Sequence, residues 1–281
     1  MQNCWSDLET ARRWLAGADR VLVGAGAGLS AAGGLDYGDP AFFRRCHPAW
    51  WDRGLRSTMD LLGHFWWFRD HPPEEYWACW ATHIQCVRYD PGVLPIYRAL
   101  ADLLRGKEVF AVTTNADGQL QRVLPEGRVF APQGDYRWLQ CARPCCGELW
   151  DGEALVRRMV AHMPSPFRVR TGDVPRCPRC GGWLVPNLRM DDTFVEAPHL
   201  RNQGAYEDFL RESRDRPLVL LELGVGFNTP VIIRWPFEAI TRQCPQARLI
   251  RVNRDQPGVP EDLEGRALSV ADGAAALLME A

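Results

Sequence analysis

The sequence predicts an α/β protein built on a doubly wound parallel sheet, into which a smaller cysteine-rich module and a set of short helices are inserted. Short apolar runs alternate with segments of helical periodicity, which is the pattern of βαβ units in a parallel sheet. Five of the ten cysteines fall in two tight clusters between about residues 138 and 185, which indicates a module of its own. A chain of 281 residues is long enough for one large domain with such an insert.

The composition is that of an ordinary globular protein and excludes several classes of partner. Hydrophobic residues make up 46% of the chain and charged residues 24%. The formal net charge is -2, so the charge balance does not favour nucleic acid or an anionic membrane surface. No apolar run approaches the roughly 20 residues that cross a bilayer. The N-terminal segment is amphipathic and acidic, unlike a signal peptide, and we expect a cytoplasmic protein.

The first elements are a helix and a strand. Ser6 and Glu9 form a capping box that opens the helix, and Gly17 can end it. The apolar run 21–23 is typical of a strand buried on both faces. It continues directly into the glycine-rich segment 24–30, and a strand that ends in such a turn is a nucleotide-binding signature.

The rest of the parallel core follows from the same alternation. Further strands are expected at residues 109–112, 129–130, 218–223 and 249–252. Helices are expected over 93–104, near Leu277, and from Thr229 as N-cap with Pro230 as the first helical residue. These elements assign residues 20–37, 93–135 and 200–281 to a Rossmann-like core.

Residues 38–92 interrupt this alternation and are rich in aromatic residues and proline. Six of the twelve tryptophans lie between Trp50 and Trp80. We interpret the segment as an insert of short helices whose tryptophans form its core, rather than as a lid or a substrate groove. We expect its three cysteines to be buried thiols, because no spacing pairs them with a histidine. These cysteines are Cys46, Cys79 and Cys86.

Residues 138–185 contain the clustered cysteines, which form two pairs separated by 31 residues. Each pair can place two thiolates on one metal ion, and four sulfurs make a closed tetrahedral zinc site of the structural kind. The candidate ligands are Cys141, Cys145, Cys177 and Cys180. Cys146 could replace Cys145, and a set of buried free thiols is the alternative interpretation.

Small or polar side chains follow four of the predicted strands. The glycines of 24–30 would let the backbone approach a pyrophosphate closely, and asparagine or aspartate at later strand ends could bind ribose hydroxyls. The alternative for any one of these residues is a turn or cap residue, which is the more frequent case for Asn253 or Asp255 taken singly. No acidic residue follows the first glycine loop at the spacing of a hydride-transferring dehydrogenase, which disfavours redox chemistry. The segments concerned are 34–37, 115–117, 224–228 and 253–255.

In their order along the chain these motifs resemble the sirtuin family. Gly-Ala-Gly-Leu-Ser at 26–30 resembles the family's Gly-Ala-Gly-x-Ser loop, and Thr-Thr-Asn-Ala-Asp-Gly at 113–118 resembles its Thr-Gln-Asn-x-Asp-Gly motif. The cysteine pairs occupy the place of the family's zinc module. Residues 224–226 and 253–255 stand where the family holds NAD, and the resemblance covers about residues 20–260.

The resemblance implies a Rossmann-like large domain, a small zinc domain, and NAD that is bound between them and consumed by cleavage of its nicotinamide–ribose bond. Asn115 and Asp117 would hold the nicotinamide ribose and the attacking nucleophile, and Gln133 would be the third catalytic residue. The implied NAD-binding residues are Gly26, Ala27, Gly28, Ser30, Asp36, Tyr37, Asn115, Asp117, Gln133, Gly224, Val225, Gly226, Asn228, Thr229, Asn253 and Asp255.

Two features depart from the deacylases of that family. Residues 34–37 lack their proline and Phe-Arg pair, and Gln133-Gly134 stands where they have His-Gly. In deacylation that histidine is the general base, and a glutamine amide cannot accept a proton near neutral pH. It can only orient a group through hydrogen bonds. The deacylase cycle should therefore stall, whereas transfer of ADP-ribose to a protein nucleophile remains possible.

The Gln-Gly-Asp-Tyr sequence at 133–136 is similar to the class M sirtuins, a microbial group. This similarity implies an ADP-ribosyltransferase that modifies a lipoylated, glycine-cleavage-H-like carrier protein, with a macrodomain hydrolase reversing the modification and a connection to oxidative stress. Two other hypotheses stay open. One is an NAD-dependent deacylase that uses another base, such as Asp135 or His162. The other is an NAD or ADP-ribose sensor without turnover.

Overall fold

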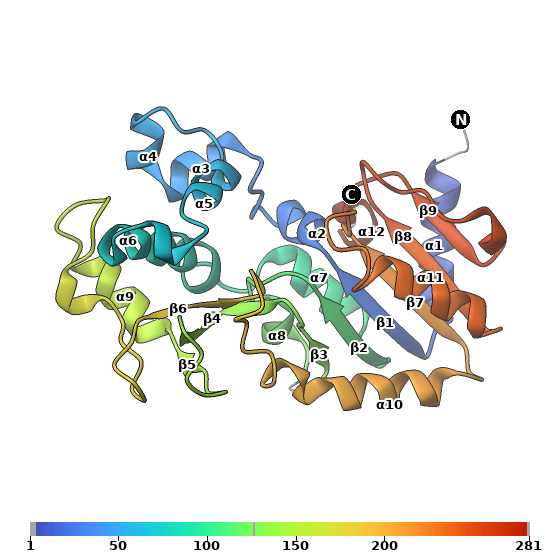
Figure 1. The fold of residues 1–281 in the computed structure, drawn as a ribbon. Coiled ribbons are helices and arrows are strands. Elements are labelled where there is room, and N and C mark those ends of the chain that lie inside the picture. The colour runs from blue at the N-terminus through green and yellow to red at the C-terminus, as the bar shows by residue number, and fades with distance from the viewer. Residues whose placement is uncertain (1–3, 126, 280–281) are drawn as a thin grey trace.

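A six-stranded parallel sheet forms the centre of the larger part of the molecule (Figure 1). The computed structural model describes residues 4–125 and 127–279. The strand order is β3-β2-β1-β7-β8-β9, which confirms the predicted doubly wound sheet. The order reverses between β1 and β7, and ligands of such sheets bind at this switch point. The strands are β1 (Arg20–Ala25), β2 (Glu108–Thr113), β3 (Val129–Phe130), β7 (Leu218–Leu223), β8 (Ala247–Val252) and β9 (Ala267–Val270).

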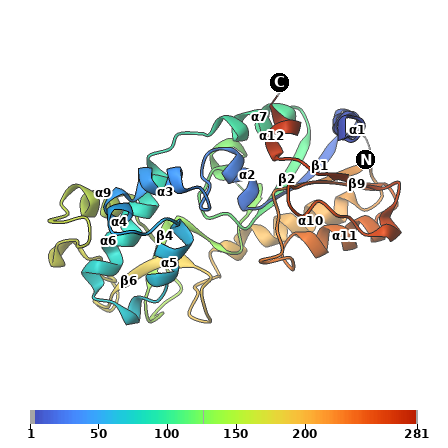
Figure 2. The ribbon, with the colours of Figure 1, turned by 90° about the horizontal axis from the view of Figure 1, so that it is seen from above.

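Both faces of this sheet are apolar because helices cover both of them (Figure 2). In β1, Val21 and Val23 pack into one helical layer while Leu22 packs into the other, as the two-residue period of a strand requires. The Val21 layer contains α1 (Cys4–Ala16), α7 (Pro95–Leu103) and α12 (Ala274–Leu278), and the opposite layer contains α10 (Gln203–Ser213) and α11 (Arg234–Gln243). Shorter helices are α2 (Ala27–Ala32), α8 (Leu120–Val123), η4 (His199–Asn202) and η5 (Glu261–Leu263).

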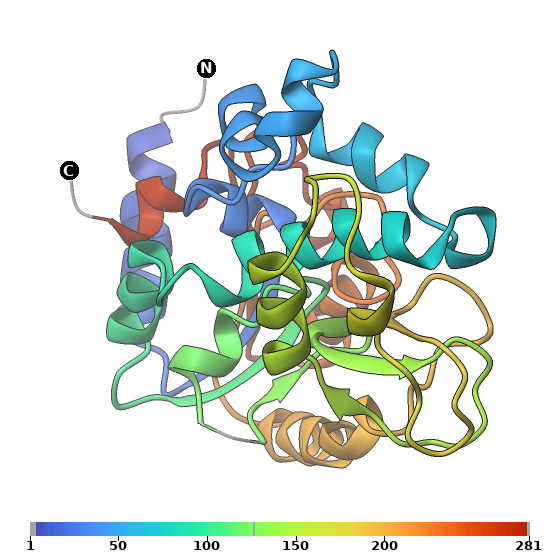
Figure 3. The same ribbon diagram turned by 90° about the vertical axis from the view of Figure 1, so that its left-hand side faces the viewer.

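The smaller part of the molecule combines the two predicted inserts around one core. An antiparallel sheet in the order β5-β4-β6 lies beside α6 and α9, which pack against each other (Figure 3). Nε1 of Trp77 on α6 donates a 3.1 Å hydrogen bond to the carbonyl of Leu184 on β6. The elements are α3 (Pro40–Cys46), α4 (Pro48–Asp52), α5 (Thr58–His64), η1 (Phe68–Asp70), α6 (Pro73–Ile84), the π-helix η2 (Gln85–Tyr89), β4 (Gly134–Cys141), β5 (Trp150–Asp151), α9 (Glu153–Ala161), η3 (Thr171–Asp173) and β6 (Leu184–Leu188).

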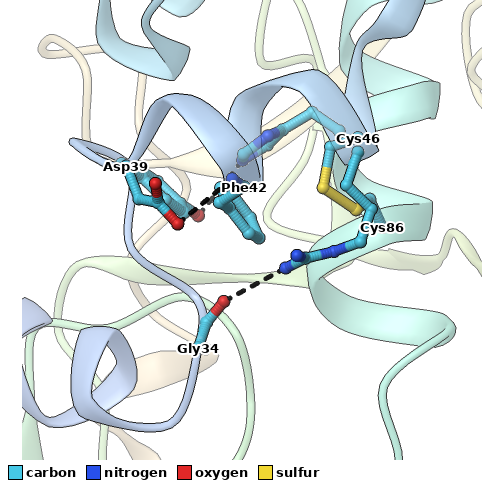
Figure 4. Close-up of a disulfide and its surroundings, with 8 residues drawn as sticks. Gly34, Asp39, Phe42, Cys46 and Cys86 are labelled. Atoms are coloured by element: carbon cyan, nitrogen blue, oxygen red, sulfur yellow. Dashed lines mark hydrogen bonds between the residues drawn. A yellow bond between two sulfur atoms is a disulfide. The ribbon is translucent and has the colours of Figure 1, made fainter.

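The tryptophan-rich segment forms a core, as predicted, but two of its cysteines differ from the prediction. Trp77 and Trp80 are fully buried, and Cys79 is a buried free thiol. Cys46 and Cys86 are not thiols, because they form a disulfide that joins α3 to η2 (Figure 4). Sequence spacing could not reveal this pair, since 40 residues separate the two cysteines and only the packing of α3 on η2 brings them together.

Two predicted helix starts are wrong. α11 begins at Arg234 rather than at Pro230, and residues 230–233 form turns. Pro236 explains the shift, because a helix begun at Pro230 would need a backbone N–H at position 236, whereas proline is tolerated in a first turn. The first helix already includes Cys4, so Ser6 lies inside it and is not its N-cap.

The strand β9 (Ala267–Val270) was not predicted from sequence. It is a four-residue edge strand with only Val270 buried, so it lacks the continuous apolar run of a central strand. In the described part of the chain, no helix has both the length and the apolar character that a membrane span requires.

Candidate functional site

Two adjoining cavities open at the carboxyl ends of the parallel strands. The glycine-loop cavity, of about 510 Å³, is lined by the turns after β1, β7, β8 and β9. The Asn115 cavity, of about 570 Å³, is lined by residues after β1 and β2, by Gln133 and Tyr136, and by Trp66 of the helical insert. The two cavities share eight lining residues and are therefore continuous. The shared residues are Ala27, Gly28, Ala31, Asp36, Thr114, Asn228, Thr229 and Arg254.

Each of the sixteen NAD-binding residues expected from sequence borders one of these cavities. The folding of the sheet explains why they meet, since parallel strands end at the same edge. Their roles toward a ligand stay a prediction. The sequence did not single out several other residues at the cavity walls, because they come from the insert, from the end of β6 and from the turn after β9. These residues include Met59, Trp66, Leu188, Arg189 and Asp272.

Three glycines allow the turns after β1 and β7 to touch. A Cβ at Gly26 would lie 2.5 Å from the carbonyl oxygen of Gly224, and one at Gly28 would lie 2.7 Å from Cα of Gly224. Gly224 itself has φ of +61°, a conformation that favours glycine. The amides of Gly26 and Gly28 donate to the carbonyls of Leu223 and Gly224, each at 3.0 Å. These glycines thus serve backbone packing as well as access to the cavity.

Asn115 and Asp117 belong to a buried hydrogen-bond network behind the cavity wall. Nδ2 of Asn115 donates to the carbonyl of Gly26 at 2.9 Å and to Oγ of Ser30 at 3.0 Å. Oγ of Ser30 donates to Oδ2 of Asp117 at 2.5 Å and lies 2.8 Å from the hydroxyl of Tyr97. The network fixes the rotamer of Asn115 by its amide nitrogen, so only its Oδ1 is left for a ligand.

The carboxylate of Asp117 is almost completely buried. Burial raises its pKa, while the hydrogen bonds from Ser30 and from the amide of Gln119 lower it, and burial prevails. A negative charge held in such surroundings acts strongly on a neighbouring positive charge, because little water screens it. Asp117 is therefore suited to stabilise a cation that develops in the cavity.

Gln133 borders the Asn115 cavity at the start of the small sheet. Its carbonyl accepts a 3.0 Å hydrogen bond from the amide of Arg189, which ties it to the segment after β6. Gly134 follows with φ of +100°, and a Cβ there would lie 2.2 Å from the carbonyl of Asn187. Glycine is thus required at position 134, and this tight crossing of β4 and β6 sets the backbone position of Gln133.

Asn253 fits the turn-residue interpretation better than a ligand-binding one. Its Nδ2 donates to the carbonyl of Val225 at 2.8 Å, and its Oδ1 accepts from the amides of Asp255 and Gln256. These bonds occupy both ends of the amide, so Asn253 shapes the wall at the end of β8. Asp255 is exposed at the same wall, where its Oδ1 lies 3.4 Å from Nε of Arg254.

The two substitute bases considered from sequence do not reach the cavities. Asp135 is buried and accepts a 2.9 Å hydrogen bond from Nε of Arg88, with which it forms an ion pair. His162 lies at the end of α9, where its Nδ1 is 3.7 Å from Asp173. Neither residue borders either cavity, so the structure does not support them as replacements for a base at position 133.

The four candidate metal ligands come together in the smaller part of the molecule. The Sγ atoms of Cys141, Cys145, Cys177 and Cys180 all lie within 4.8 Å of one another. Two of the sulfur–sulfur distances are 3.7 Å and 3.6 Å, close to the roughly 3.8 Å edge of a tetrahedron with zinc–sulfur bonds of about 2.3 Å. The amide of Gly182 lies 3.4 Å from Sγ of Cys180, as expected for a zinc knuckle.

The geometry of this cluster favours Cys145 over Cys146 as the fourth ligand, since Cys145 takes part in it. The four sulfurs fit a zinc ion and would fill all its coordination positions, which is the arrangement of structural rather than catalytic zinc sites. It lies on the small sheet, where the ligand Cys141 ends β4, whose first residue follows Gln133. A metal there would hold the strand that positions Gln133.

Comparison with known proteins gives several sequence relatives, although no protein-family model matches the chain. A Fusarium oxysporum protein named probable bifunctional ADP-ribose hydrolase/ADP-ribosyltransferase is 36% identical over 93% of this chain, which spans 45% of that protein. A Staphylococcus aureus protein ADP-ribosyltransferase is 28% identical over 94% of this chain and 83% of its own length. A Ralstonia nicotianae NAD-dependent protein deacylase is 27% identical over 63% of this chain and 61% of its own length.

Solved structures with the same fold are Sir2 proteins. A Sir2 homologue crystallised with NAD matches with a TM-score of 0.64 and 18% identity, over 96% of this chain and 90% of that one. A mutant Sir2 homologue in complex with ADP-ribose matches with a TM-score of 0.61 and 18% identity, over 96% and 93% of the two chains. The chain therefore has a Sir2-like fold, and its sequence relatives include proteins named ADP-ribosyltransferases.

Proposed function

We propose that this protein is an NAD-dependent protein ADP-ribosyltransferase, which transfers ADP-ribose from NAD to a protein acceptor and releases nicotinamide. The observation that carries the proposal is the composition of the cavity wall. Gln133 borders the Asn115 cavity, and no histidine is among the described residues that border either cavity. Two relatives named ADP-ribosyltransferases support the same activity.

NAD would occupy both cavities in this proposal. The turn with Gly26 and Gly28 would lie along the pyrophosphate, and Asn115 and Asp117 would face the nicotinamide ribose. Support comes from the continuity of the cavities and from the NAD and ADP-ribose complexes of Sir2 proteins that share the fold.

The proposed reaction is a substitution at the anomeric carbon of the nicotinamide ribose. The bond from this carbon to the ring nitrogen breaks, and its electron pair leaves with nicotinamide, which becomes neutral. A nucleophile of the acceptor protein forms the new bond and releases its proton. The buried carboxylate of Asp117 would stabilise the positive charge that develops on the ribose. The Gln133 amide would orient the ribose or the acceptor by hydrogen bonds, since it cannot take a proton.

We propose a lipoylated, glycine-cleavage-H-like carrier protein as the acceptor, acting in the cytoplasm. This part of the proposal is supported by the resemblance of residues 133–136 to the class M sirtuins. We further propose that a macrodomain hydrolase removes the modification. Its support is the name of the Fusarium relative, which joins ADP-ribose hydrolase and transferase activities in one protein.

An NAD-dependent deacylase is the second candidate, and the similarity to the Ralstonia deacylase favours it. Such an enzyme would need a general base at the ribose. Asp135 is engaged by Arg88 and His162 lies near Asp173, so neither offers one to the cavity. The composition of the cavity wall thus favours transfer over deacylation.

The test is incubation with NAD labelled in its ADP-ribose part, with a lipoylated carrier, the same carrier without lipoate, and an acylated peptide. Label on the lipoylated carrier together with free nicotinamide supports the transferase. Deacylated peptide without labelled protein supports the deacylase, and NAD binding without nicotinamide release supports a sensor. The variant Asn115→Ala should abolish any label that depends on this site.

A further inference from the structure

A fully buried histidine contacts two tyrosine hydroxyls at the wall of the Asn115 cavity. Nε2 of His83, on α6, lies 3.1 Å from Oη of Tyr37 and 3.3 Å from Oη of Tyr136. The two hydroxyl oxygens are 3.3 Å apart, so the three polar atoms form a triangle. Both tyrosines border the cavity with Asn115 and Gln133, whereas His83 lies behind them.

The three rings come from three different segments of the chain. Tyr37 follows α2 in the larger part of the molecule, Tyr136 lies on β4 of the small sheet, and His83 belongs to the helical insert. The imidazole meets both phenol rings edge to face, with centroid distances of 5.1 Å and 5.4 Å. One side chain of α6 thus connects the segment after α2 with β4, and both of these segments border the cavity.

Packing alone does not explain an imidazole at this position. The neighbouring side chains of α6 that are equally buried are apolar or aromatic, such as Trp77, Trp80 and Ile84. Burial of a polar ring costs free energy unless it is hydrogen bonded. Nδ1 of His83 has no partner in the described part of the chain, so the two tyrosine hydroxyls are the polar contacts that offset this cost.

The triangle carries no charge at neutral pH. Burial lowers the pKa of His83, and the neighbouring His47 lowers it further. Burial raises the pKa of Tyr136 to about 12 and raises that of Tyr37 well above its ordinary value. A neutral imidazole can share a hydrogen bond with a phenol and fix the direction of its proton without adding a charge beside Asp117.

We infer that His83 is a positioning residue of this active site, which holds the hydroxyls of Tyr37 and Tyr136 and thereby fixes the cavity wall opposite Asn115. This inference rests on the proposed function, because the reaction measured in the test is the release of nicotinamide from NAD. Without the imidazole, the hydroxyls of Tyr37 and Tyr136 would be held only by their own 3.3 Å contact, so the wall would hold the ribose less firmly in a reactive position.

The experiment compares five variants in steady-state release of nicotinamide from NAD. In His83→Phe the ring volume is kept and the hydrogen bonds are lost, and kcat should fall about tenfold, the size of one lost hydrogen bond. His83→Gln, whose amide can reach the same hydroxyls, should recover most of this loss. His47→Phe is the matched control, because His47 is equally buried and stacks on His83 but neither of its ring nitrogens has a partner among the described residues. In a Tyr37→Phe/Tyr136→Phe background, His83→Phe should have no further effect.

A folded His83→Phe variant with wild-type kcat and KM would overturn the inference, and so would an equal loss in His47→Phe. If His83→Phe does not fold, the double tyrosine variant should show the tenfold loss instead. If the wild-type protein releases no nicotinamide, the proposed function fails by itself. In that case the ¹⁵N resonance of His83 Nε2 tests the contact between His83 and the two tyrosines. It should shift in the double tyrosine variant, and an unchanged resonance would refute the contact.

Discussion

Ser30 donates its hydroxyl proton to the buried carboxylate of Asp117, with 2.5 Å between Oγ and Oδ2. Ser30 also accepts a hydrogen bond from Nδ2 of Asn115, which leaves its own proton directed at Asp117. The residues that carry the proposed chemistry are thus bonded to one another through a serine of the glycine-rich turn. This network keeps a charged carboxylate in a place where burial opposes its charge.

Asp117→Asn should stabilise the protein and reduce nicotinamide release at least about a hundredfold. Burial raises the pKa of Asp117, so folding favours its protonated form. Stability from this group is therefore present at low pH and is lost as the pH rises through the raised pKa. At neutral pH the variant should be more stable than the wild-type protein, and the difference should shrink on acidification. Chemical denaturation at several pH values measures it.

The variant Asp135→Asn should have the opposite effect on stability from Asp117→Asn. Asp135 is also buried, but its partner Arg88 would be left without a counter-charge. This variant should lose about 3 kcal/mol of stability. Equal destabilisation of both variants would contradict the unfavourable burial of Asp117.

Asn115→Ala should lower nicotinamide release at least about a hundredfold while the fold persists. The substitution removes Oδ1 from the cavity and breaks the bonds to Gly26 and Ser30. Asn202→Ala is the control, because its amide also donates to a backbone carbonyl, that of Val129, but away from the cavities. Turnover and the circular dichroism of both variants should be compared. Wild-type turnover in Asn115→Ala would remove this residue from the proposed mechanism.

Gly26→Ala should destabilise the protein by about 2 kcal/mol and weaken NAD binding. Its Cβ would lie 2.5 Å from a backbone oxygen of Gly224, and neither backbone segment can move without disturbing β1 or β7. Gly204→Ala, in α10 with open space around its Cβ, should be neutral or slightly stabilising. Thermal unfolding and calorimetric NAD titration test both, and equal behaviour of the two variants would disprove the close approach.

Substitution of Cys177 and Cys180 by serine should release zinc and unfold the small domain. Cys146→Ser should leave the zinc content unchanged, because Cys146 is outside the four-sulfur cluster. Metal analysis after dialysis against a mild chelator gives the stoichiometry. A zinc-free double variant with full activity would refute the structural role of the cluster, and loss of zinc in Cys146→Ser would reopen the choice of ligand.

Reduction of the disulfide between Cys46 and Cys86 should lower the free energy of unfolding by about 4 kcal/mol, as expected for a loop closed by residues 40 apart. The measurement is denaturation with and without reductant in zinc-containing buffer, which keeps the cysteine cluster loaded. In a Cys46→Ser/Cys86→Ser variant the reductant should have no further effect. Equal stability of oxidised and reduced wild-type protein would mean that the pair does not constrain the unfolded chain.

The sequence by itself determined the parallel sheet, because continuous apolar runs such as 218–223 must be buried on both faces. It also located the two cysteine pairs, since a tetrahedral zinc site sets the spacing within each pair, but only the structure places Cys145 rather than Cys146 in the cluster. The glycine-rich turn and the Asn115–Asp117 motif could likewise be located, because strand ends of a parallel sheet share one edge.

Only the tertiary structure decided the features that depend on contacts between distant segments. Cys46 meets Cys86, and His83 meets Tyr37 and Tyr136, through the packing of segments that are distant along the chain, and the sequence carries no signal of these contacts. The same packing engages Asp135 with Arg88 and so withdraws it from the cavity. Local periodicity specifies which residues are buried, but the partner of each buried polar group is set by the arrangement of whole elements in space.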